Sequence, residues 1–347
     1  MSAVAEAIKK VATGPHLSKD LTLDESRAAM LEILEDKVDP VQAAVLLIAL
    51  RMKRETDDEN LGMLQAMQQV TCQQDLNLAD VLILADPFNG FNRHCPVAAF
   101  LPAVLAACGL PAVSQGVYEM GPKFGVTHAK VLEAAGLAVD LTPEKIGQQL
   151  HNPACGWAYS DQAQVTPALF NLQQLRKLMI KRPSIATLEK LLMPVKATRT
   201  HLQIGFVHKA YPPVLDFLAR QAGFASALIV RGLEGGVVPT LRETSMNHFL
   251  HDGTLHAMPI HPADFGIYQE TRGVVASGDS PTAKETAELG LAALNGEKGP
   301  ARDVLVLGAA MALLQCHGHD SPQHAADLVR QTLDNGKALT HFNQATR

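Results

Sequence analysis

Hydrophobic residues in the first seventy positions recur at helical spacing, and helix-starting residues precede them. In "TLDESRAAMLEILED", Thr22 and Glu25 have the spacing of a capping box, and Thr56 and Glu59 repeat that spacing before "NLGMLQAMQQV". Between them, "DPVQAAVLLIALRMK" begins with a capping aspartate and a proline suited to the first helical position. Three helices with short connections predict a small helical bundle rather than part of a β-α-β unit.

The rhythm of the chain changes after about residue 76, where short apolar runs alternate with helical segments. The expected strands lie in "DVLILA", "PAVSQGV", "GWAYS", "HLQIGFVH" and "SALIVRG", and the expected helices cover 96–108, 128–136, 143–150 and 212–222. This alternation predicts a mostly parallel sheet with helices on both faces.

The alternation stops between about 167 and 195. There "PALFNLQQLRKLMIKRPSIATLEKLLMPV" has helical spacing on both sides of Pro183 and no strand. We expect this segment to join the N-terminal helices. The predicted fold class is α/β, with a small all-α dimerisation domain (1–75 and 167–195) and a larger α/β domain (76–166 and 196–347) whose central sheet is flanked by helices. A cleft between such domains, outside the carboxyl ends of parallel strands, is where ligands bind.

Composition narrows the class of protein. The 347 residues are 47% hydrophobic, which is enough for a sizeable core. The net charge of −5 means that the protein as a whole is not an electrostatic match for nucleic acid, so that such binding would require a local basic groove. No apolar run is long enough to span a membrane, and "MSAVAEAIKKVATG" lacks the apolar core of a signal peptide. The five cysteines form no C-x-x-C pair. We therefore expect a cytoplasmic protein with reduced thiols and no membrane partner.

The loop in "ADPFNGFNRH" (85–94) follows an expected strand and precedes an expected helix. Its Asn89-Gly90 turn allows close approach of a ligand to the backbone, and the helix that follows would direct free N–H groups towards an anion. Asn92 and Arg93 lie beside it, and the arginine, with the next histidine, could add positive charge. The alternative is an ordinary strand–turn–helix connection, because a single glycine is a weak signal.

Three further segments carry candidate phosphate or ligand contacts. The loop "SQGVYEMGPKFG" contains Gly116 and Lys123, and the turn in "ALIVRGLEGGVVP" carries Arg231 and Glu234. In "LRKLMIKRP", Arg182 is the residue that we expect to point into the cleft and pair with a carboxylate or phosphate. The histidines of "HFLHDGTLHAMPIH" and "HGHD" have no metal-ligand spacing, so no metal site is expected there.

The order of these features resembles that of the anthranilate phosphoribosyltransferases, relatives of the pyrimidine nucleoside phosphorylases. The similarity spans nearly the whole chain, and "GVTHAKVLEAAGLAVDLTPEKI", "LAACG" and "QIGFVH" carry much of it. It implies a small α domain, a large α/β domain and a homodimer formed through the small domains.

The family's ligand motifs match this chain unevenly. Its G-T-G-G-D diphosphate loop falls on residues 86–90 and keeps only the last glycine, while its N-x-S-T falls on 96–99, where no hydroxyl is present. Its K-H-G-N-R loop falls on 114–118, where only Gly116 matches. The family's magnesium-binding Asp-Glu pair falls on Val237 and Val238, and valine offers no oxygen ligand. We therefore expect no cofactor and no magnesium.

These departures leave several functional hypotheses open. The first is a divergent glycosyl- or phosphoribosyltransferase that binds a phosphorylated ligand in the interdomain cleft, with an unknown acceptor and no catalytic residue assigned. The second is a catalytically inactive nucleic-acid-binding relative, because divergent members that have lost the same motifs bind nucleic acid, here through "LRKLMIKR" and "RMKR". The third is genuine anthranilate phosphoribosyl transfer with rearranged metal ligands. A nucleoside phosphorylase-like activity is the last.

Overall fold

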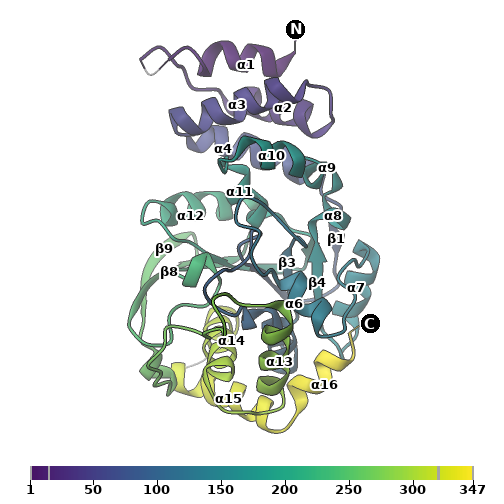
Figure 1. Ribbon diagram of the computed structural model, residues 1–347, viewed down its shortest axis with the longest axis vertical. Coiled ribbons are helices and arrows are strands. Elements are labelled where there is room, and N and C mark those ends of the chain that lie inside the picture. Colours follow the sequence, from purple (N-terminus) through teal and green to yellow (C-terminus); the bar gives the residue numbers. More distant parts are fainter. Residues whose placement is uncertain (1, 15, 319–320, 346–347) are drawn as a thin grey trace.

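The N-terminal region forms a helical bundle. The computed structural model describes residues 2–14, 16–318 and 321–345 (Figure 1). The bundle consists of α1 (Ala3–Val11), α2 (Leu23–Leu34), α3 (Pro40–Lys53) and α4 (Asp57–Gln69). Both predicted capping boxes are complete, at the starts of α2 and α4. The sequence predicted three of these helices, and α1, which packs on α2 and α3, is an addition to them.

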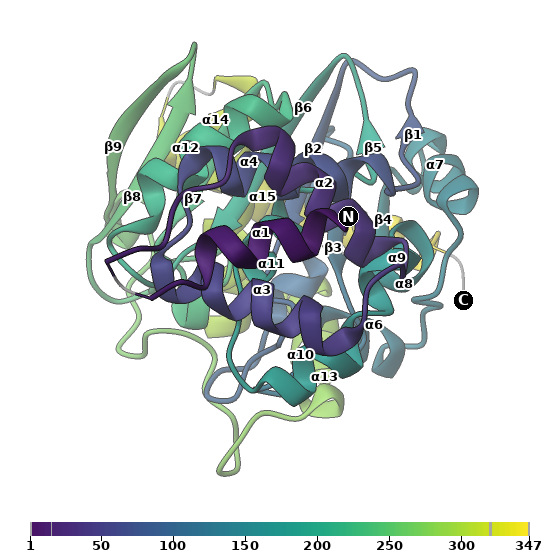
Figure 2. The ribbon, with the colours of Figure 1, turned by 90° about the horizontal axis from the view of Figure 1, so that it is seen from above.

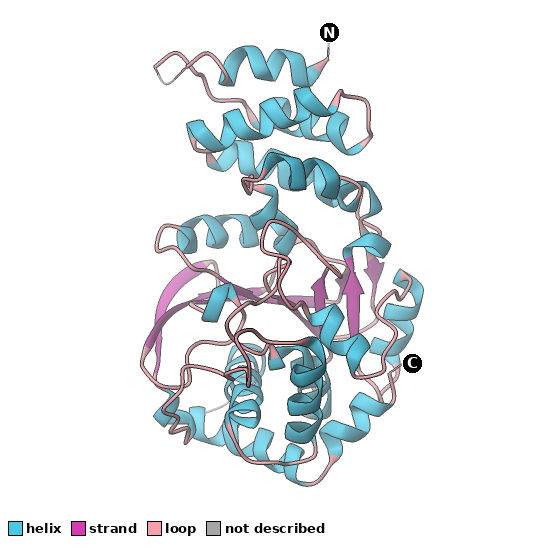
Figure 3. Ribbon diagram, viewed as in Figure 1, coloured by secondary structure: helices cyan, strands magenta, loops and turns pink. Residues whose placement is uncertain are grey.

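A seven-stranded sheet, magenta in Figure 3, forms the centre of the larger part of the molecule. Its strand order is β4-β3-β2-β6-β7-β8-β9. Its strands are β2 (Asp80–Ala85), β3 (Ala112–Gly116), β4 (Trp157–Asp161), β6 (Arg199–Gly205), β7 (Ser226–Val230), β8 (Ser245–His251) and β9 (Thr254–Ile260). Neighbours from β4 to β7 are parallel. Each predicted strand run overlaps one of these five strands, so the mostly parallel sheet is confirmed.

The antiparallel edge of the sheet was not predicted. β8 pairs with β7 and β9 in antiparallel register, and the two-residue turn Asp252-Gly253 joins β8 to β9. The sequence prediction treated this segment only as a group of histidines. The hairpin extends the sheet at the end away from β4.

Successive residues of β2 point to two separate cores, as the two-residue period of a strand requires. Leu82 and Leu84 lie in the core formed with α5 (Leu101–Ala107) and the C-terminal helices. Val81 and Ile83 lie in the core shared with α12 (Tyr211–Ala222) and the N-terminal bundle. The C-terminal helices are α13 (Ala283–Leu294), α14 (Pro300–His317), α15 (Pro322–Asp334) and α16 (Lys337–Asn343). Helices therefore cover both faces of the sheet (Figure 1).

The short helices between β4 and β6 lie against the N-terminal bundle. They are α8 (Gln162–Val165), α9 (Pro167–Phe170), α10 (Gln173–Met179) and α11 (Ile185–Leu188). α10 contacts α3, and α11 contacts α4 (Figure 2). These contacts agree with the expected return of this segment to the helical domain, while the domain boundaries themselves stay a prediction.

The chain passes between the helical part and the sheet in three places, and these connections lie side by side. The Cys72 N–H donates to Val165 O at 2.7 Å, and the hydroxyls of Thr71 and Thr166 are 3.1 Å apart. The third connection joins them through a short parallel ladder between β1 (Gln74–Asp75) and β5 (Val195–Lys196). Hydrogen bonds thus link all three connections to one another.

The C-terminal helix is fixed to the sheet through the only tryptophan of the sequence. Trp157 stacks on Phe342 of α16 with ring centroids 5.5 Å apart, and its indole N–H donates to His341 O at 3.0 Å. Of the described helices, none has the combination of length and apolar character that a membrane crossing would need.

Candidate functional site

Four neighbouring parallel strands end in loops along one edge of the sheet. Because β3, β2, β6 and β7 are adjacent and parallel, the loops that follow them emerge at the same edge. These loops carry Lys123 after β3, Arg93 after β2, Lys209 after β6 and Arg231 after β7. A row of positive side chains therefore follows the carboxyl edge of the sheet.

The carboxylate of Glu234 lies in the middle of these loops. It accepts hydrogen bonds from the backbone N–H groups of Asn92 (3.0 Å), Arg93 (2.9 Å) and His94 (3.1 Å). The ammonium group of Lys123 forms a salt bridge with the same carboxylate. The loop after β2 thus does hold an anion, but the anion is a side chain of the protein itself.

The environment of Glu234 keeps the carboxylate ionised. Its side chain is only 8% exposed. Burial alone would raise its pKa, but the hydrogen bonds from His94, Lys123 and the Asn92 backbone outweigh that effect and hold the pKa of Glu234 well below its usual range. The negative charge of Glu234 is therefore balanced by the Lys123 ammonium group and by the N–H groups of the loop after β2.

Glu234 reaches this position from a tight glycine turn. Its own backbone is left-handed (φ 53°, ψ 16°), which is a strained conformation for a glutamate. The turn packs so closely that a Cβ on Gly232 would lie 1.6 Å from Gly236 O, and a Cβ on Gly205 would lie 2.0 Å from Gly235 O. Only glycine fits at these two positions.

The Asn89-Gly90 turn contacts protein rather than open space. Gly90 has φ 74°, and a Cβ there would lie 2.5 Å from the carbonyl carbon of Gly125. The carbonyl of the buried Asn89 accepts the N–H of Gly125 at 3.0 Å. The glycine is therefore needed for the approach of the neighbouring loop, and the anion-binding N–H groups lie a few residues further on.

A second buried carboxylate, which sequence reasoning missed, lies directly after β2. Asp86 accepts the N–H of Val237 at 3.1 Å and lies 2.8 Å from Nε2 of His128. The other ring nitrogen of His128 is 2.9 Å from the hydroxyl of Ser114. No motif relates these residues, because they come together only when the strands are paired. The group ties the loops after β2 and β7 to the start of α6 (His128–Ala134).

Lys190 is another cation that the sequence did not single out. Its ammonium group donates to Gly205 O at 2.7 Å. Burial lowers the pKa of Lys190 to about 8, although the nearby carboxylates of Asp86 and Glu189 oppose that shift. The residue brings a titratable positive charge to the carboxyl end of β6.

The expectation for Arg182 is not met by its contacts. Arg182 is exposed, and its backbone carbonyl accepts a hydrogen bond from Arg51, while no ion pair of its guanidinium occurs among the described residues. The buried arginine–carboxylate pair is formed by Arg176 instead, which holds Glu189 through two hydrogen bonds of 2.7 and 2.8 Å. Arg182 follows α10 by a few residues in a turn, so its side chain remains at the surface.

The cavity between the helical part and the sheet is small. It has a volume of about 10 Å³, and its walls include Gly116 at the end of β3. The buried Ser160 Oγ and Gln162 Oε1 also reach this cavity and have no hydrogen-bond partner in the described part of the chain. A space of this size holds about one water molecule, not a sugar phosphate.

The side chains at the expected metal position do not fit a magnesium ion. Val237 and Val238 are buried in the core beside α14 and offer no oxygen ligand. Across the described ranges, no three His, Cys, Asp or Glu side chains gather as a possible ligand set. The "HGHD" segment includes His319 and Asp320, which lie outside the described residues.

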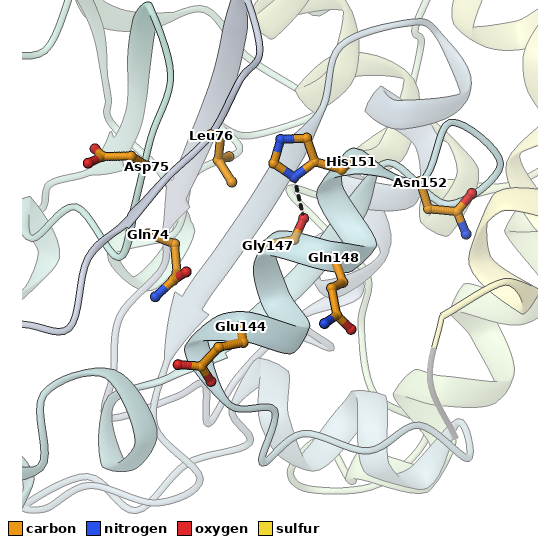
Figure 4. A pocket seen from close by; sticks show the side chains of 8 residues that line it. All are labelled: Gln74, Asp75, Leu76, Glu144, Gly147, Gln148, His151 and Asn152. Carbon is orange, nitrogen blue, oxygen red and sulfur yellow. Dashed lines mark hydrogen bonds between the residues drawn. The ribbon is translucent and has the colours of Figure 1, made fainter.

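A wider surface pocket lies elsewhere, between β1 and α7 (Pro143–His151) (Figure 4). Its volume is about 480 Å³, and it is lined by Gln74, Asp75, Leu76, Glu144, Gly147, Gln148, His151 and Asn152. Both ring nitrogens of His151 are used in structural contacts, with Gly147 O at 2.8 Å and the Asn77 N–H at 3.1 Å. No residue of this pocket belongs to the loops that surround Glu234.

Comparison with known proteins accounts for this architecture. Residues 5–71 match the model of the glycosyl transferase family helical bundle domain, and residues 91–339 match that of the family's a/b domain. The chain belongs to this glycosyl transferase family. Over 96% of both chains it is 30% identical to an anthranilate phosphoribosyltransferase of Methanobrevibacter smithii, and it is 27% identical to one of Thermomicrobium roseum over 98% of this chain and 95% of the relative.

Solved structures of anthranilate phosphoribosyltransferases share the fold. Anthranilate phosphoribosyltransferase from Thermus thermophilus superposes with a TM-score of 0.78 at 21% identity, covering 99% of this chain and 98% of that one. The yeast enzyme, whose structure is a complex with PRPP and Mg, superposes with a TM-score of 0.81 at 17% identity, covering 98% and 96%. The family resemblance expected from the sequence is therefore confirmed over nearly the whole chain.

Proposed function

We propose that this member of the glycosyl transferase family binds nucleic acid along the carboxyl edge of its sheet and does not transfer phosphoribosyl groups to anthranilate. The observation that carries the proposal is the Glu234 carboxylate, which already occupies the N–H groups of the loop after β2. A diphosphate directed at this loop would first have to displace that carboxylate. Two buried valines stand at the position expected to hold its magnesium ion.

The row of cations along the same edge supports a strand-like, polyanionic ligand. The side chains of Arg93, Lys209 and Arg231 are exposed, and among the described residues none of them has an ion-pair partner. They follow adjacent strands, which are about 5 Å apart, so together they extend over roughly 10 Å. Exposed aromatic rings follow strands of the same edge, Phe124 (45%) in the loop after β3 and Tyr211 (38%) at the start of α12 after β6. Cations that track a backbone and rings on which bases stack are typical of single-stranded nucleic-acid binding.

The proposal predicts a salt-dependent affinity for a labelled single-stranded oligonucleotide, measured by fluorescence anisotropy. Replacing Arg93, Lys209 and Arg231 by alanine should weaken binding at low salt by about tenfold or more and should flatten the salt dependence, because fewer counterions are then released. A matched variant with Lys145, Lys284 and Lys298 replaced by alanine loses the same charge from other surfaces. It should bind like the parent protein.

Two results would count against nucleic-acid binding. The first is no change in anisotropy even at low salt. The second is equal weakening by both triple variants, which would mean that net charge rather than the carboxyl edge governs the signal. Rapid, magnesium-dependent formation of phosphoribosyl-anthranilate would overturn the proposal that the transferase reaction is lost.

A second candidate function is a transferase that acts on a phosphorylated small molecule with an unknown acceptor. It is favoured by the backbone N–H groups of residues 92–94, which converge on one anion together with Lys123. The nearby Asn89, Gly90, Gly116 and Arg231 would line the space around that anion. This candidate requires room for the ligand beside these loops, and the cavity that Gly116 lines has a volume of only about 10 Å³.

Thermal unfolding with phosphoribosyl diphosphate, with and without magnesium, tests this second candidate. A ligand that binds the folded state should raise the melting temperature. An unchanged melting temperature at millimolar ligand would argue strongly against it.

We also propose a homodimer formed through the helical domain. Val41, Val45 and Met52 are exposed along one face of α3, and Leu178 and Ile180 are exposed beside them on and after α10. Several exposed apolar side chains on two helices that contact each other are typical of an interface. A second copy of the chain would cover it, because the same patch on each partner would be self-complementary.

Light scattering after size-exclusion chromatography measures this association. We expect the mass of a dimer for the parent protein and the mass of a monomer for Val45→Glu, which places a charge in the middle of the patch. Gln42→Glu, on the same turn of α3, adds the same charge beside the patch and should remain dimeric. A monomeric parent protein would contradict the proposal.

A further inference from the structure

Glu234 binds the loop after β2 from outside, as a ligand would, because it comes from a distant segment of the chain. Its carboxylate is 140 residues away in sequence from His94, yet it uses the N–H groups of three consecutive residues and the Lys123 ammonium group. These donors belong to the loops after β2 and β3, and the acceptor comes from the turn after β7. Such a concave set of backbone N–H groups with a lysine is an arrangement that also binds phosphate.

The surroundings of this contact point to a larger anion. A carboxylate carries one negative charge. The exposed side chains of Arg93, whose backbone N–H binds this carboxylate, and of Arg231, three residues before Glu234, have no ion pair among the described residues. A phosphate group brings more charge and more acceptor oxygens, so it would satisfy the same N–H groups and would also attract these two cations. The edge of the sheet thus carries more positive charge than the single carboxylate of Glu234 neutralises.

The conformation of Glu234 makes it able to leave. The residue has a strained left-handed backbone and lies between Gly232 and the pair Gly235-Gly236. Glycines on both sides provide the backbone freedom that a local rearrangement of this turn requires. The paired part of β7 ends earlier, at Val230, so the turn can move without breaking the sheet.

We propose that Glu234 masks a phosphate-binding site formed by residues 92–94 and Lys123, and that a phosphate group of the ligand displaces it. The identity of that ligand as nucleic acid rests on the proposed function, whereas the masked site itself does not. In this arrangement the parent protein binds phosphate weakly, because its affinity is reduced by the small fraction of molecules in which Glu234 has left.

Inorganic phosphate is the probe for the masked site. Glu234→Ala removes the internal competitor, so we expect it to bind phosphate about tenfold more tightly than the parent protein by isothermal titration calorimetry. Phosphate should also raise the melting temperature of this variant more than that of the parent. The control Glu288→Ala removes an exposed carboxylate from α13, with the same change in net charge, and should respond like the parent.

The fluorescence of Trp157 checks that each variant folds. This tryptophan is buried and lies far from Glu234 in the sequence. If Glu234→Ala does not fold, Glu234→Gln takes its place, because the amide keeps the shape and removes the charge. The inference is overturned if phosphate affects the folded variant no more than it affects the parent protein and Glu288→Ala.

The oligonucleotide assay separates this inference from the proposed function. Tighter binding of both phosphate and oligonucleotide by Glu234→Ala is the expected result. Tighter binding of phosphate without oligonucleotide binding by any variant would uphold the masked site and overturn the nucleic-acid function. Oligonucleotide binding by the parent, with no gain in phosphate binding by the variant, would overturn the masked site and leave the function standing.

Discussion

At the scale of single residues, Glu234 contributes stability that depends on pH. Its buried carboxylate accepts hydrogen bonds from three backbone N–H groups and from Lys123, and hydrogen bonds to a charged group are stronger than neutral ones. We expect Glu234→Gln to lower the free energy of unfolding at pH 7 by about 1–3 kcal/mol, as measured by urea denaturation. The folded-state pKa of Glu234 is depressed, so this contribution is fully present above the usual glutamate value of 4.5 and declines as the pH falls below it.

The control for this experiment is Glu288→Gln, on the exposed face of α13, which should leave the free energy of unfolding unchanged at either pH. An equal loss for Glu234→Gln at pH 7 and at pH 3 would contradict the charged hydrogen bonds as its cause.

Asp161 should have the opposite pH dependence. Burial raises the pKa of Asp161 to about 6, and the nearby Asp140 adds to this effect, while the hydrogen bond from the Ala163 N–H opposes it. The folded state therefore carries an unfavourable buried charge at neutral pH. Stability is lost as the pH rises from the usual aspartate value of 3.8 through the raised pKa.

Asp161→Asn is the substitution that tests this. Asparagine can still cap α8, so the variant should be about 1–3 kcal/mol more stable than the parent at pH 8 and equal to it near pH 4. The comparison uses urea denaturation at both pH values. A variant that is less stable at pH 8 would show that the carboxylate is needed there.

At the scale of elements, the contact between α2 and α4 depends on one glycine. A Cβ on Gly62 of α4 would lie 2.3 Å from Leu23 O and 2.9 Å from the Arg27 backbone nitrogen. Gly62→Ala would force the two helices apart, and we expect it to lower the free energy of unfolding by about 1–3 kcal/mol.

Gly147 provides the matched control, because it lies within α7 with its nearest outside neighbour at 3.8 Å. Gly147→Ala should be neutral or should stabilise the protein by up to about 1 kcal/mol, through helix propensity alone. Chemical denaturation of both variants gives the comparison, and a similar effect of the two alanines would exclude close packing as the cause.

The sequence is most informative about elements whose signals are local. The capping residues Thr22 and Thr56 predict helix starts correctly, and the five apolar runs predict the parallel strands. The β8–β9 hairpin was missed although a local signal was present. Asp252 and Gly253 both have positive φ, as a two-residue hairpin turn requires, and Asp-Gly is a common pair in that turn. The segment was instead interpreted only through its histidines, as a group without metal-ligand spacing.

The candidate site is less predictable because it depends on contacts between distant segments. Glu234 was expected to bind a ligand, and nothing in the sequence near it indicates that its partner is the loop at 92–94. Likewise, Asp86 and His128 belong to different elements and have no shared motif. Arg176 and Arg182 lie in one basic segment, and only the turn after α10 decides which of them is buried.

At the scale of the whole molecule, one core joins the helical bundle to the sheet. It includes Leu46 and Leu64 of the bundle together with Val81, Ile83 and Leu202 of the sheet. We therefore expect both parts to unfold in a single transition. Trp157 fluorescence reports only on the sheet, while far-UV circular dichroism reports on all helices, so the two thermal curves should coincide. A loss of helical signal before the fluorescence change would contradict this expectation.

The bundled connections between the two parts also affect how the protein responds to proteases. Because the segments around Thr71, Val165 and Pro194 are hydrogen-bonded to one another, a cut in any one of them leaves two others intact and the cut ends still paired. Limited digestion there should give nicked molecules that separate on a denaturing gel but elute together under native conditions. Any swing of one lobe against the other must likewise bend all three segments at once, so this seam is the natural position for a hinge.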